Sequence, residues 1–161
     1  MSALAIFHEP SDLCGTGGIC HECIHAVTSW RGYKPQYNSI YVNTDKLAPG
    51  LLGLYIAQAK LFFLVTVNCK KYPCVLVHWY SLVGDSSDEN TGMWVIEHEV
   101  VDGKPQTVVI HLDTILHLAH LLPIYHNKPA PRDIKYTDSL DTSSEFYISK
   151  FMDHHAFKIA F

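Results

Sequence analysis

Apolar and polar residues alternate along much of the chain after Asn38, with the period of two that is typical of β-strands. The clearest case is LYIAQAKLFFLVTV at residues 54–67; its first half also fits a helix, but the run from Phe62 to Val67 favours one long strand. Further strands are expected at residues 38–42, 73–80, 92–100, 107–112 and 120–125. The polar link 68–72 and the Asp102-Gly103 turn signal are of hairpin type, so we expect antiparallel pairing.

The C-terminal part of the chain has a helical pattern. Thr142 and Glu145 have the spacing of a capping box, in which two side chains satisfy the first N–H groups of a helix. Ile148, Phe151, Met152 and His155 then follow at helical spacing, and this stripe is apolar at its centre. We therefore expect a small helix over residues 145–157 that docks on the sheet, and a shorter helical turn capped by Asp113.

These elements predict a mainly β fold, a curved antiparallel sheet or partly open barrel with a small C-terminal helix. Residues 1–36 are rich in Gly, Cys, His and Pro without a sustained period, so we interpret them as an irregular segment preceding a β-rich domain at 37–161. The whole chain has 161 residues, of which 48% are hydrophobic, enough for one domain with a sizeable core.

Charge and hydropathy narrow the class of protein. The net charge is −4 and the pI is near 6.2, and Lys70-Lys71 is the only basic doublet, which argues against direct binding of nucleic acid through a basic surface. The apolar run at residues 3–7 is shorter than a signal peptide requires, and the longest apolar stretch contains Gln58 and Lys60. We expect an intracellular protein that is not membrane-bound.

The N-terminal segment contains a candidate zinc site. Cys20 and Cys23 have the C-x2-C spacing, and Cys14 with His25, or with His21, completes four ligands of the type that tetrahedral Zn²⁺ takes. The alternative is that these cysteines are reduced and bind nothing, since five cysteines without a secretory signal do not indicate a disulfide framework.

Histidines offer a second candidate chemistry. His117 and His120 are spaced to meet on one helical turn, but no H-E-x-x-H motif is present, and core or surface histidines satisfied by backbone groups are the better interpretation. Cys74 or Ser81 with His78 resembles a nucleophile and base on paper, but no G-x-S-x-G motif supports it. A metal-dependent hydrolase or nuclease-associated domain that uses Cys and His residues remains the enzyme alternative.

An acidic loop lies between two aromatic stretches. Its acids are Asp85, Asp88 and Glu89, and the flanking aromatic residues are Trp79, Tyr80 and Trp94. The carboxylates suit a divalent cation, although the spacing is not that of an EF-hand. Acids beside aromatic faces also suit an organic cation such as a methylated ammonium group. The third interpretation is a polar turn with the aromatic residues in the core.

Three stretches carry a family resemblance: YPCVLVHWYSLVGDSSDENTGMWVIE, VIHLDTILHLAHLLPIY and DSLDTSSEFYISKFMDHHAF. From about Tyr37 to its end, the chain resembles the C-terminal region of proteins encoded by Plavaka-type transposons of the Kyakuja–Dileera–Zisupton class in mushroom-forming fungi. The matching positions are Trp79, Gly84, Asp85, Asp88, 91–94, 111–113, His120, Leu121, Pro123, Tyr125, 138–141 and 153–155. Those proteins have an RNase H-like catalytic core upstream that has no counterpart here. The resemblance therefore implies an accessory or recognition module, or a transposon remnant without a selected function, and not a transposase.

The order of the expected strands is also similar to that of bromo-adjacent homology domains, β-rich chromatin modules of which some bind histone tails through aromatic residues. Fold similarity alone does not transfer function. Together the two resemblances favour a non-catalytic, nuclear interaction module whose partner is a protein or peptide, such as a histone tail. Its expected binding residues are Trp79, Tyr80, Trp94, Asp85, Asp88 and Glu89.

Overall fold

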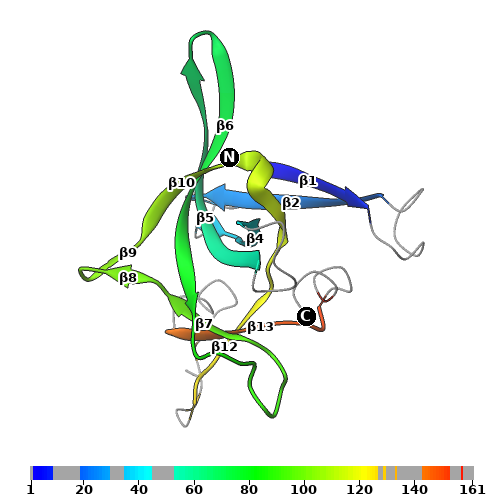
Figure 1. The fold of residues 1–161 in the computed structure, drawn as a ribbon, viewed down its shortest axis with the longest axis vertical. Helices are drawn as coiled ribbons and strands as arrows, with labels where there is room; N and C mark the ends of the chain where they lie inside the picture. The colour runs from blue at the N-terminus through cyan, green and yellow to red at the C-terminus, as the bar shows by residue number, and fades with distance from the viewer. Residues whose placement is uncertain are drawn as a thin grey trace.

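The computed structural model is a strongly curled antiparallel sheet with projecting hairpins, as Figure 1 shows. It describes residues 2–8, 19–29, 35–44, 53–126, 129, 133, 143–152 and 157. The strands are β1 (Ser2–His8), β2 (Ile19–Val27), β3 (Gln36–Tyr37), β4 (Ser39–Asn43), β5 (Leu54–Val67), β6 (Lys70–Leu82), β7 (Val95–His98), β8 (Val100–Val101), β9 (Lys104–Pro105), β10 (Thr107–His111), β11 (Ile115–Leu118), β12 (Leu121–Pro123) and β13 (Glu145–Ile148). The predicted mainly β fold is confirmed. Among the described residues, no helix is long and apolar enough to cross a membrane.

The long hairpin of β5 and β6 forms the centre of the sheet. Strand β5 spans residues 54–67 as predicted, and it pairs with β6 from Ala57↔Trp79 to Val67↔Lys70. The connection is tighter than the polar link suggested, because Asn68 and Cys69 alone form it. Both residues have positive φ, at 49° and 62°, which is the backbone conformation of a two-residue type I′ turn.

The outer edge of β6 pairs with two strands in succession. Strand β7 lies beside residues 80–82 and β10 lies beside residues 74–78, both antiparallel to β6. Between β7 and β10, at the position of Trp79, the chain turns away from the edge of β6 and forms the β8–β9 hairpin. This hairpin turns at Asp102-Gly103, as the sequence predicted. The Trp79 backbone spans the junction, since its N–H donates to Gln106 O at 3.2 Å and its carbonyl accepts from Glu99 N at 3.0 Å.

Strands β11 and β12 close the curl. They follow one another along the chain, yet β11 pairs with β4 at one end of the sheet order and β12 pairs with β13 at the other. The two residues between them are held as well, because Ala119 N donates to Ser39 O and Ser149 N donates to His120 O, each at 2.8 Å. The segment from β11 to β12 thus connects the two ends of the sheet, and the sheet curls into a partly open barrel.

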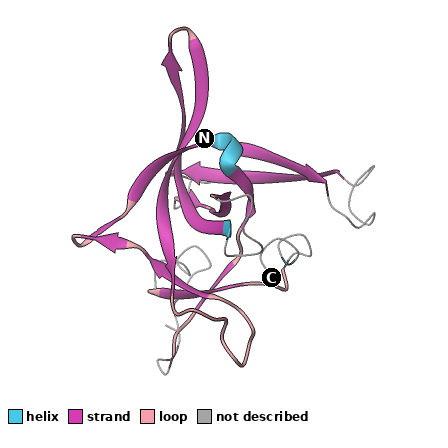
Figure 2. Cartoon of the chain, in the orientation of Figure 1, coloured by secondary structure: helices cyan, strands magenta, loops and turns pink. Residues whose placement is uncertain are grey.

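The helical turn predicted after Asp113 is misplaced. A 3-10 turn covers Leu112–Thr114, visible in cyan in Figure 2, and residues 115–118 are strand β11. The side chain of His111, not of Asp113, accepts a hydrogen bond from the Asp113 N–H at the start of this turn.

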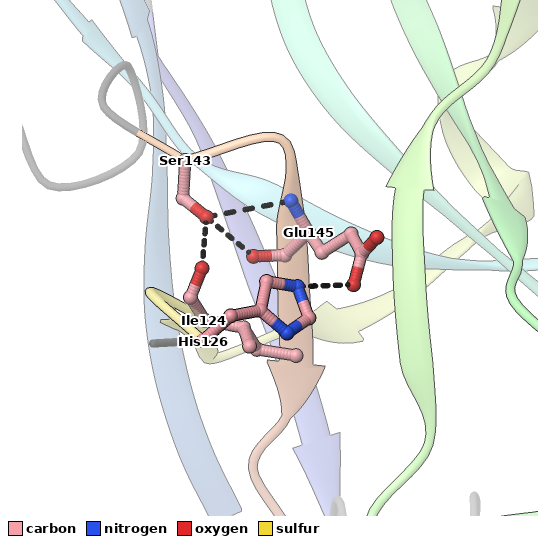
Figure 3. A network of polar contacts seen from close by, with 4 residues as sticks. All are labelled: Ile124, His126, Ser143 and Glu145. Carbon is pink, nitrogen blue, oxygen red and sulfur yellow. Dashed lines mark hydrogen bonds and ion pairs between the residues drawn. The ribbon is translucent and has the colours of Figure 1, made fainter. Parts of the chain in front are cut away.

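The helix predicted from Glu145 is wrong at its start, because residues 145–148 form strand β13 between β7 and β12. The expected cap partner, Thr142, lies outside the described residues. Figure 3 shows what Glu145 contacts instead: its carboxylate lies 3.0 Å from His126 Nε2, and the Ser143 hydroxyl donates to Ile124 O at 2.7 Å. These contacts fasten the beginning of β13 to the chain that follows β12. Of the rest of the predicted helix, residues 153–156 lie outside the described residues.

The N-terminal segment is not irregular where the structure describes it, because β1 and β2 form an antiparallel hairpin, Ser2↔His25 to His8↔Ile19. The hairpin covers one face of the sheet. On that face lies the Ile40 cluster, made of Ile24, Ala26, Ile40, Val42, Ala57, Ala59, Phe62, Val75 and Val77. On the other face of β4 lies the Tyr41 cluster, made of Tyr41, Ile56, Tyr80, Ile96, Ala119, Phe146 and Ile148. Strands β1 and β2 therefore contribute to one of the two apolar clusters.

Candidate functional site

The sheet has an opening where β5 and β6 separate. Their ladder ends at Ala57↔Trp79; before Ala57, residues 54–56 pair with β4 alone, and beyond Trp79, residues 80–82 pair with β7. The two strand ends diverge and leave a cleft of about 370 Å³ between them. It is lined by Leu54, Tyr55, Ile56, Tyr80, Ser81, Leu82, Ile96 and Glu99.

The floor of this cleft is rigid and apolar. Ile56, Tyr80 and Ile96 belong to the buried Tyr41 cluster, so packing of the sheet fixes their positions. The ring of Tyr80 stacks on His98, with centroids 4.5 Å apart. At the rim, Tyr55 is 51% exposed, and its ring makes an edge contact with Trp79, with the ring centroids 5.7 Å apart. The cleft thus combines a fixed aromatic floor with an accessible aromatic rim.

Two polar side chains complete the lining. Ser81 lies in β6, and Glu99 lies just after β7, where the chain leaves for the β8–β9 hairpin. Backbone bonds hold Glu99 on both sides, because its N–H donates to Trp79 O and its carbonyl accepts from Gln106 N at 2.8 Å. With its amide nitrogen turned toward Glu99, the Gln106 side chain also donates to both carboxylate oxygens. A positioned carboxylate beside aromatic rings can attract a cation.

The acidic loop between β6 and β7 is organised around Asp88. One carboxylate oxygen of Asp88 accepts from the Thr91 N–H and the Thr91 hydroxyl, each at 2.8 Å, and from the Asn90 N–H at 3.2 Å. The backbone of Asp88 bonds to Gly92 and Met93. Gly92 has a φ of 62°, which favours glycine, and a side chain there would displace the Lys150 ammonium group. Asp85 and Glu89 are exposed, so in this loop Asp88 holds the turn together.

We expect protonation of Asp88 to loosen this loop. Its hydrogen bonds from Thr91 hold the pKa of the Asp88 carboxyl below its ordinary value of 3.8. A lowered pKa means that the stabilisation is present above 3.8 and is lost as the pH falls through the lower, folded-state value. The Thr91 amide shift, followed by NMR, should therefore titrate with a midpoint below 3.8 and should not titrate in Asp88→Asn. A midpoint at or above 3.8 would show that these bonds do not favour the carboxylate.

The structure does not bring the three predicted aromatic residues together as walls of one pocket. Trp79 packs against the Ile40 cluster, whereas Tyr80 belongs to the Tyr41 cluster and Trp94 packs against it. Trp79 and Tyr80 are adjacent in β6, so their side chains leave opposite faces of the strand. Of the predicted binding residues, Tyr80 alone lines the cleft.

The predicted zinc ligands lie only partly within the described residues. Cys20 and Cys23 are both in the extended backbone of β2; the Cys23 side chain is exposed and His25 is half-buried. The His25 N–H donates to the Asn38 side chain at 2.6 Å. Cys14 and the side chain of Cys20 lie outside the part of the chain that the structure describes. Within the part of the chain that the structure describes, no three His, Cys, Asp or Glu residues lie close enough to hold a metal.

His117, one of the two histidines expected to meet on a helical turn, has structural contacts instead. His117 is buried in β11, where its ring Nδ1 lies 2.9 Å from Leu118 O and 3.3 Å from the Glu22 carboxylate. Glu22 also accepts from Leu118 N at 3.0 Å, so these contacts tie the N-terminal hairpin to β11. His117 and His120 lie three residues apart along extended chain and not on one helical turn.

The suggested nucleophile pairs do not form. Cys74 and His78 are four residues apart in β6, which is about 13 Å along an extended strand. Ser81 and His78 are three apart and leave opposite faces. The pKa of His78 lies below its ordinary value of 6.5, mainly because of burial and then because of the positive charges of Lys60 and His98.

Sequence reasoning missed Tyr55 and Glu99. Each occupies an unremarkable position in an alternating strand pattern, and their proximity depends on where β5 and β6 separate. For Glu99 one signal was available: a charged residue close to the Asp102-Gly103 turn is expected to be exposed. Comparison with protein-family models, with curated proteins and with solved structures finds no match to this chain.

Proposed function

We propose that the chain is a non-catalytic interaction module that binds an extended peptide in the cleft between β5 and β6. A lysine side chain of the peptide, methylated or not, lies against the Tyr55 ring and near Glu99. The observation that carries the proposal is the cleft itself, in which an exposed aromatic rim, an apolar floor and one carboxylate meet. A histone tail is a peptide of this kind, and the resemblance to chromatin modules supports this choice. We propose a nuclear location together with it.

The chemistry of the cleft supports binding more than hydrolysis. A cation over a tyrosine face contributes about 0.5–2 kcal/mol, and a nearby carboxylate adds attraction. The methylene stem of lysine also suits apolar walls such as Leu54 and Leu82. Among the described lining residues, Ser81 offers a hydroxyl but the lining includes no histidine to activate it.

Calorimetric titration with histone-tail peptides, unmodified and trimethylated on lysine, tests this proposal. We expect Tyr55→Ala and Glu99→Gln each to weaken binding about 5–30-fold, which corresponds to about 1–2 kcal/mol. The matched control is Glu89→Gln, the same chemical change in the exposed acidic loop, which should leave the affinity unchanged.

Two results would count against the cleft. Absence of binding by every tail would contradict the proposed ligand class. A loss in Glu89→Gln as large as that in Glu99→Gln would move the site to the acidic loop that the sequence singled out. A peptide in which glutamine replaces the lysine should bind at least as weakly as the lysine peptide binds the Glu99→Gln variant, because it loses the contact with the Tyr55 ring as well.

A further inference from the structure

The outer part of the β5–β6 hairpin projects from the rest of the sheet. Figure 1 shows this arm, residues 61–73, at the top of the view, beyond the strands that flank its base. Phe62, at the base of the arm, is buried in the Ile40 cluster, but beyond it apolar side chains are exposed on both faces: Leu64 is 63% exposed and Val67 is 50% exposed. A two-stranded ribbon is only marginally stable alone in water, so an apolar arm of this kind indicates a contact surface.

The two edges of the arm differ. Residues 67 and 70 flank the two-residue turn and form a hydrogen-bonded pair in such hairpins, so by alternation Phe62, Leu64 and Thr66 direct their backbone groups to the outer edge of β5. No described strand pairs with that edge beyond Ala59. On the β6 edge the corresponding positions are Lys71 and Pro73, a charge and a residue without an N–H, and both discourage strand pairing. The edge of β5 at 61–67 has neither.

The charge of the arm is one-sided. From residue 54 to residue 84 the sequence contains Lys60, Lys70 and Lys71 but no Asp or Glu, although the net charge of the chain is −4. Lys70 and Lys71 lie in β6 at the tip of the arm, where they pair with Val67 and Thr66 of β5. A strand added to β5 would lie about 10 Å from β6, two strand spacings, which long acidic and basic side chains can bridge.

We propose that the edge of β5 at residues 61–67, with which no described strand pairs, binds an extended segment of a partner protein that alternates apolar residues and carboxylates. The segment adds a strand antiparallel or parallel to residues 61–67. It satisfies the outward backbone groups of Phe62, Leu64 and Thr66 and places its acidic side chains toward Lys70 and Lys71. Main-chain bonds give such strand addition its affinity, and the side chains give it specificity.

Two other occupants fit less well. A second copy of the arm would offer the same uncharged edge and further lysines, and so no carboxylate to complement the tip. A lipid bilayer would leave the outward backbone groups of the arm without partners in hydrocarbon, where each unsatisfied group costs several kcal/mol.

The test uses the full chain and a fluorescein-labelled synthetic peptide of alternating valine and threonine with glutamates at both ends. Leu64→Pro removes one outward N–H without removing a bond of the β5–β6 ladder, and Leu64→Ala keeps the N–H while shortening the side chain. In fluorescence polarisation we expect Leu64→Pro to weaken binding at least tenfold and Leu64→Ala no more than about threefold. The double variant Lys70→Glu, Lys71→Glu should lose about tenfold.

Amide exchange of the unmodified chain provides an independent readout should Leu64→Pro fail to fold. The peptide should slow exchange at Phe62, Leu64 and Thr66 more than at Phe63 and Val65, whose N–H groups already lie in the β5–β6 ladder. Equal losses in Leu64→Pro and Leu64→Ala, equal binding of a peptide with lysine in place of glutamate, or absence of the alternating protection would each overturn the proposal.

Two further outcomes separate this surface from its alternatives. Concentration-dependent self-association that gives the same alternating protection without peptide would assign the edge to a second copy and overturn the acidic partner. Tyr55→Ala should not change the affinity for the acidic peptide. A loss there would show that the peptide occupies the cleft between β5 and β6 and would also overturn the strand-addition site.

Discussion

Phe146→Ala is expected to lower the free energy of unfolding by about 3–5 kcal/mol. The Phe146 side chain is 0% exposed, and its ring makes edge contacts with Tyr80 at 6.0 Å and His98 at 5.8 Å. Phe146 itself pairs with Ile96 of β7 on one side and with Pro123 of β12 on the other, so the backbone around the ring is held and the space that the ring leaves cannot fully close. The cost therefore includes both the lost burial and the cavity.

Denaturant-induced unfolding measures this effect as a change in midpoint at constant slope. Tyr147→Ala is the matched control, because Tyr147 is the next aromatic residue in β13 and is only half-buried. We expect the control to cost clearly less than Phe146→Ala. Equal costs would contradict the alternation of a strand, and a loss below about 1 kcal/mol at Phe146 would contradict its place in the core.

Ile24→Ala is expected to cost about 2–5 kcal/mol, although Ile24 lies in a segment whose sequence has no regular period. Ile24 is 1% exposed and packs in the Ile40 cluster with side chains of β4, β5 and β6. The N-terminal hairpin therefore stabilises the sheet that it covers. The same unfolding measurement checks the expectation, and a cost near zero would show that the hairpin is not docked.

Cys23→Ala is the control for this position, since Cys23 is the preceding residue of β2 and its side chain is exposed. We expect it to change stability by less than about 0.5 kcal/mol. Elemental analysis of the purified protein adds a second readout. Stoichiometric zinc that is lost in Cys23→Ala, together with a stability loss comparable to that of Ile24→Ala, would give the C-x2-C pair a structural metal role.

Local patterns in the sequence determined most of the strands and their pairing sense. The alternation of residues 54–67 and the turn at Asp102-Gly103 depend on side chains a few positions apart, so one sequence suffices to find them. The apolar content and the short connections then limited the fold to an antiparallel, curled sheet. Each of these predictions is confirmed by the strand order.

The C-terminal segment shows where local patterns are ambiguous. Ile148, Phe151 and Met152 have helical spacing, but Glu-Phe-Tyr-Ile at 145–148 also alternates, with Phe146 and Ile148 buried. A helix satisfies its backbone within its own segment, whereas a strand depends on partners elsewhere in the chain. Open edges of β7 and β12 supply those partners for residues 145–148, and this decides in favour of a strand.

The candidate site depended wholly on tertiary structure. The sequence identified acids and aromatic residues that are close along the chain, but adjacent residues of a strand point to opposite faces, so Trp79 and Tyr80 separate. Tyr55 and Glu99 meet because β6 exchanges one partner strand for another at Trp79. The sequence by itself determined most of the strands between residues 38 and 111. Which strand ends diverge, and hence which side chains line the opening, follows from pairing between distant segments, whose energies no local pattern contains.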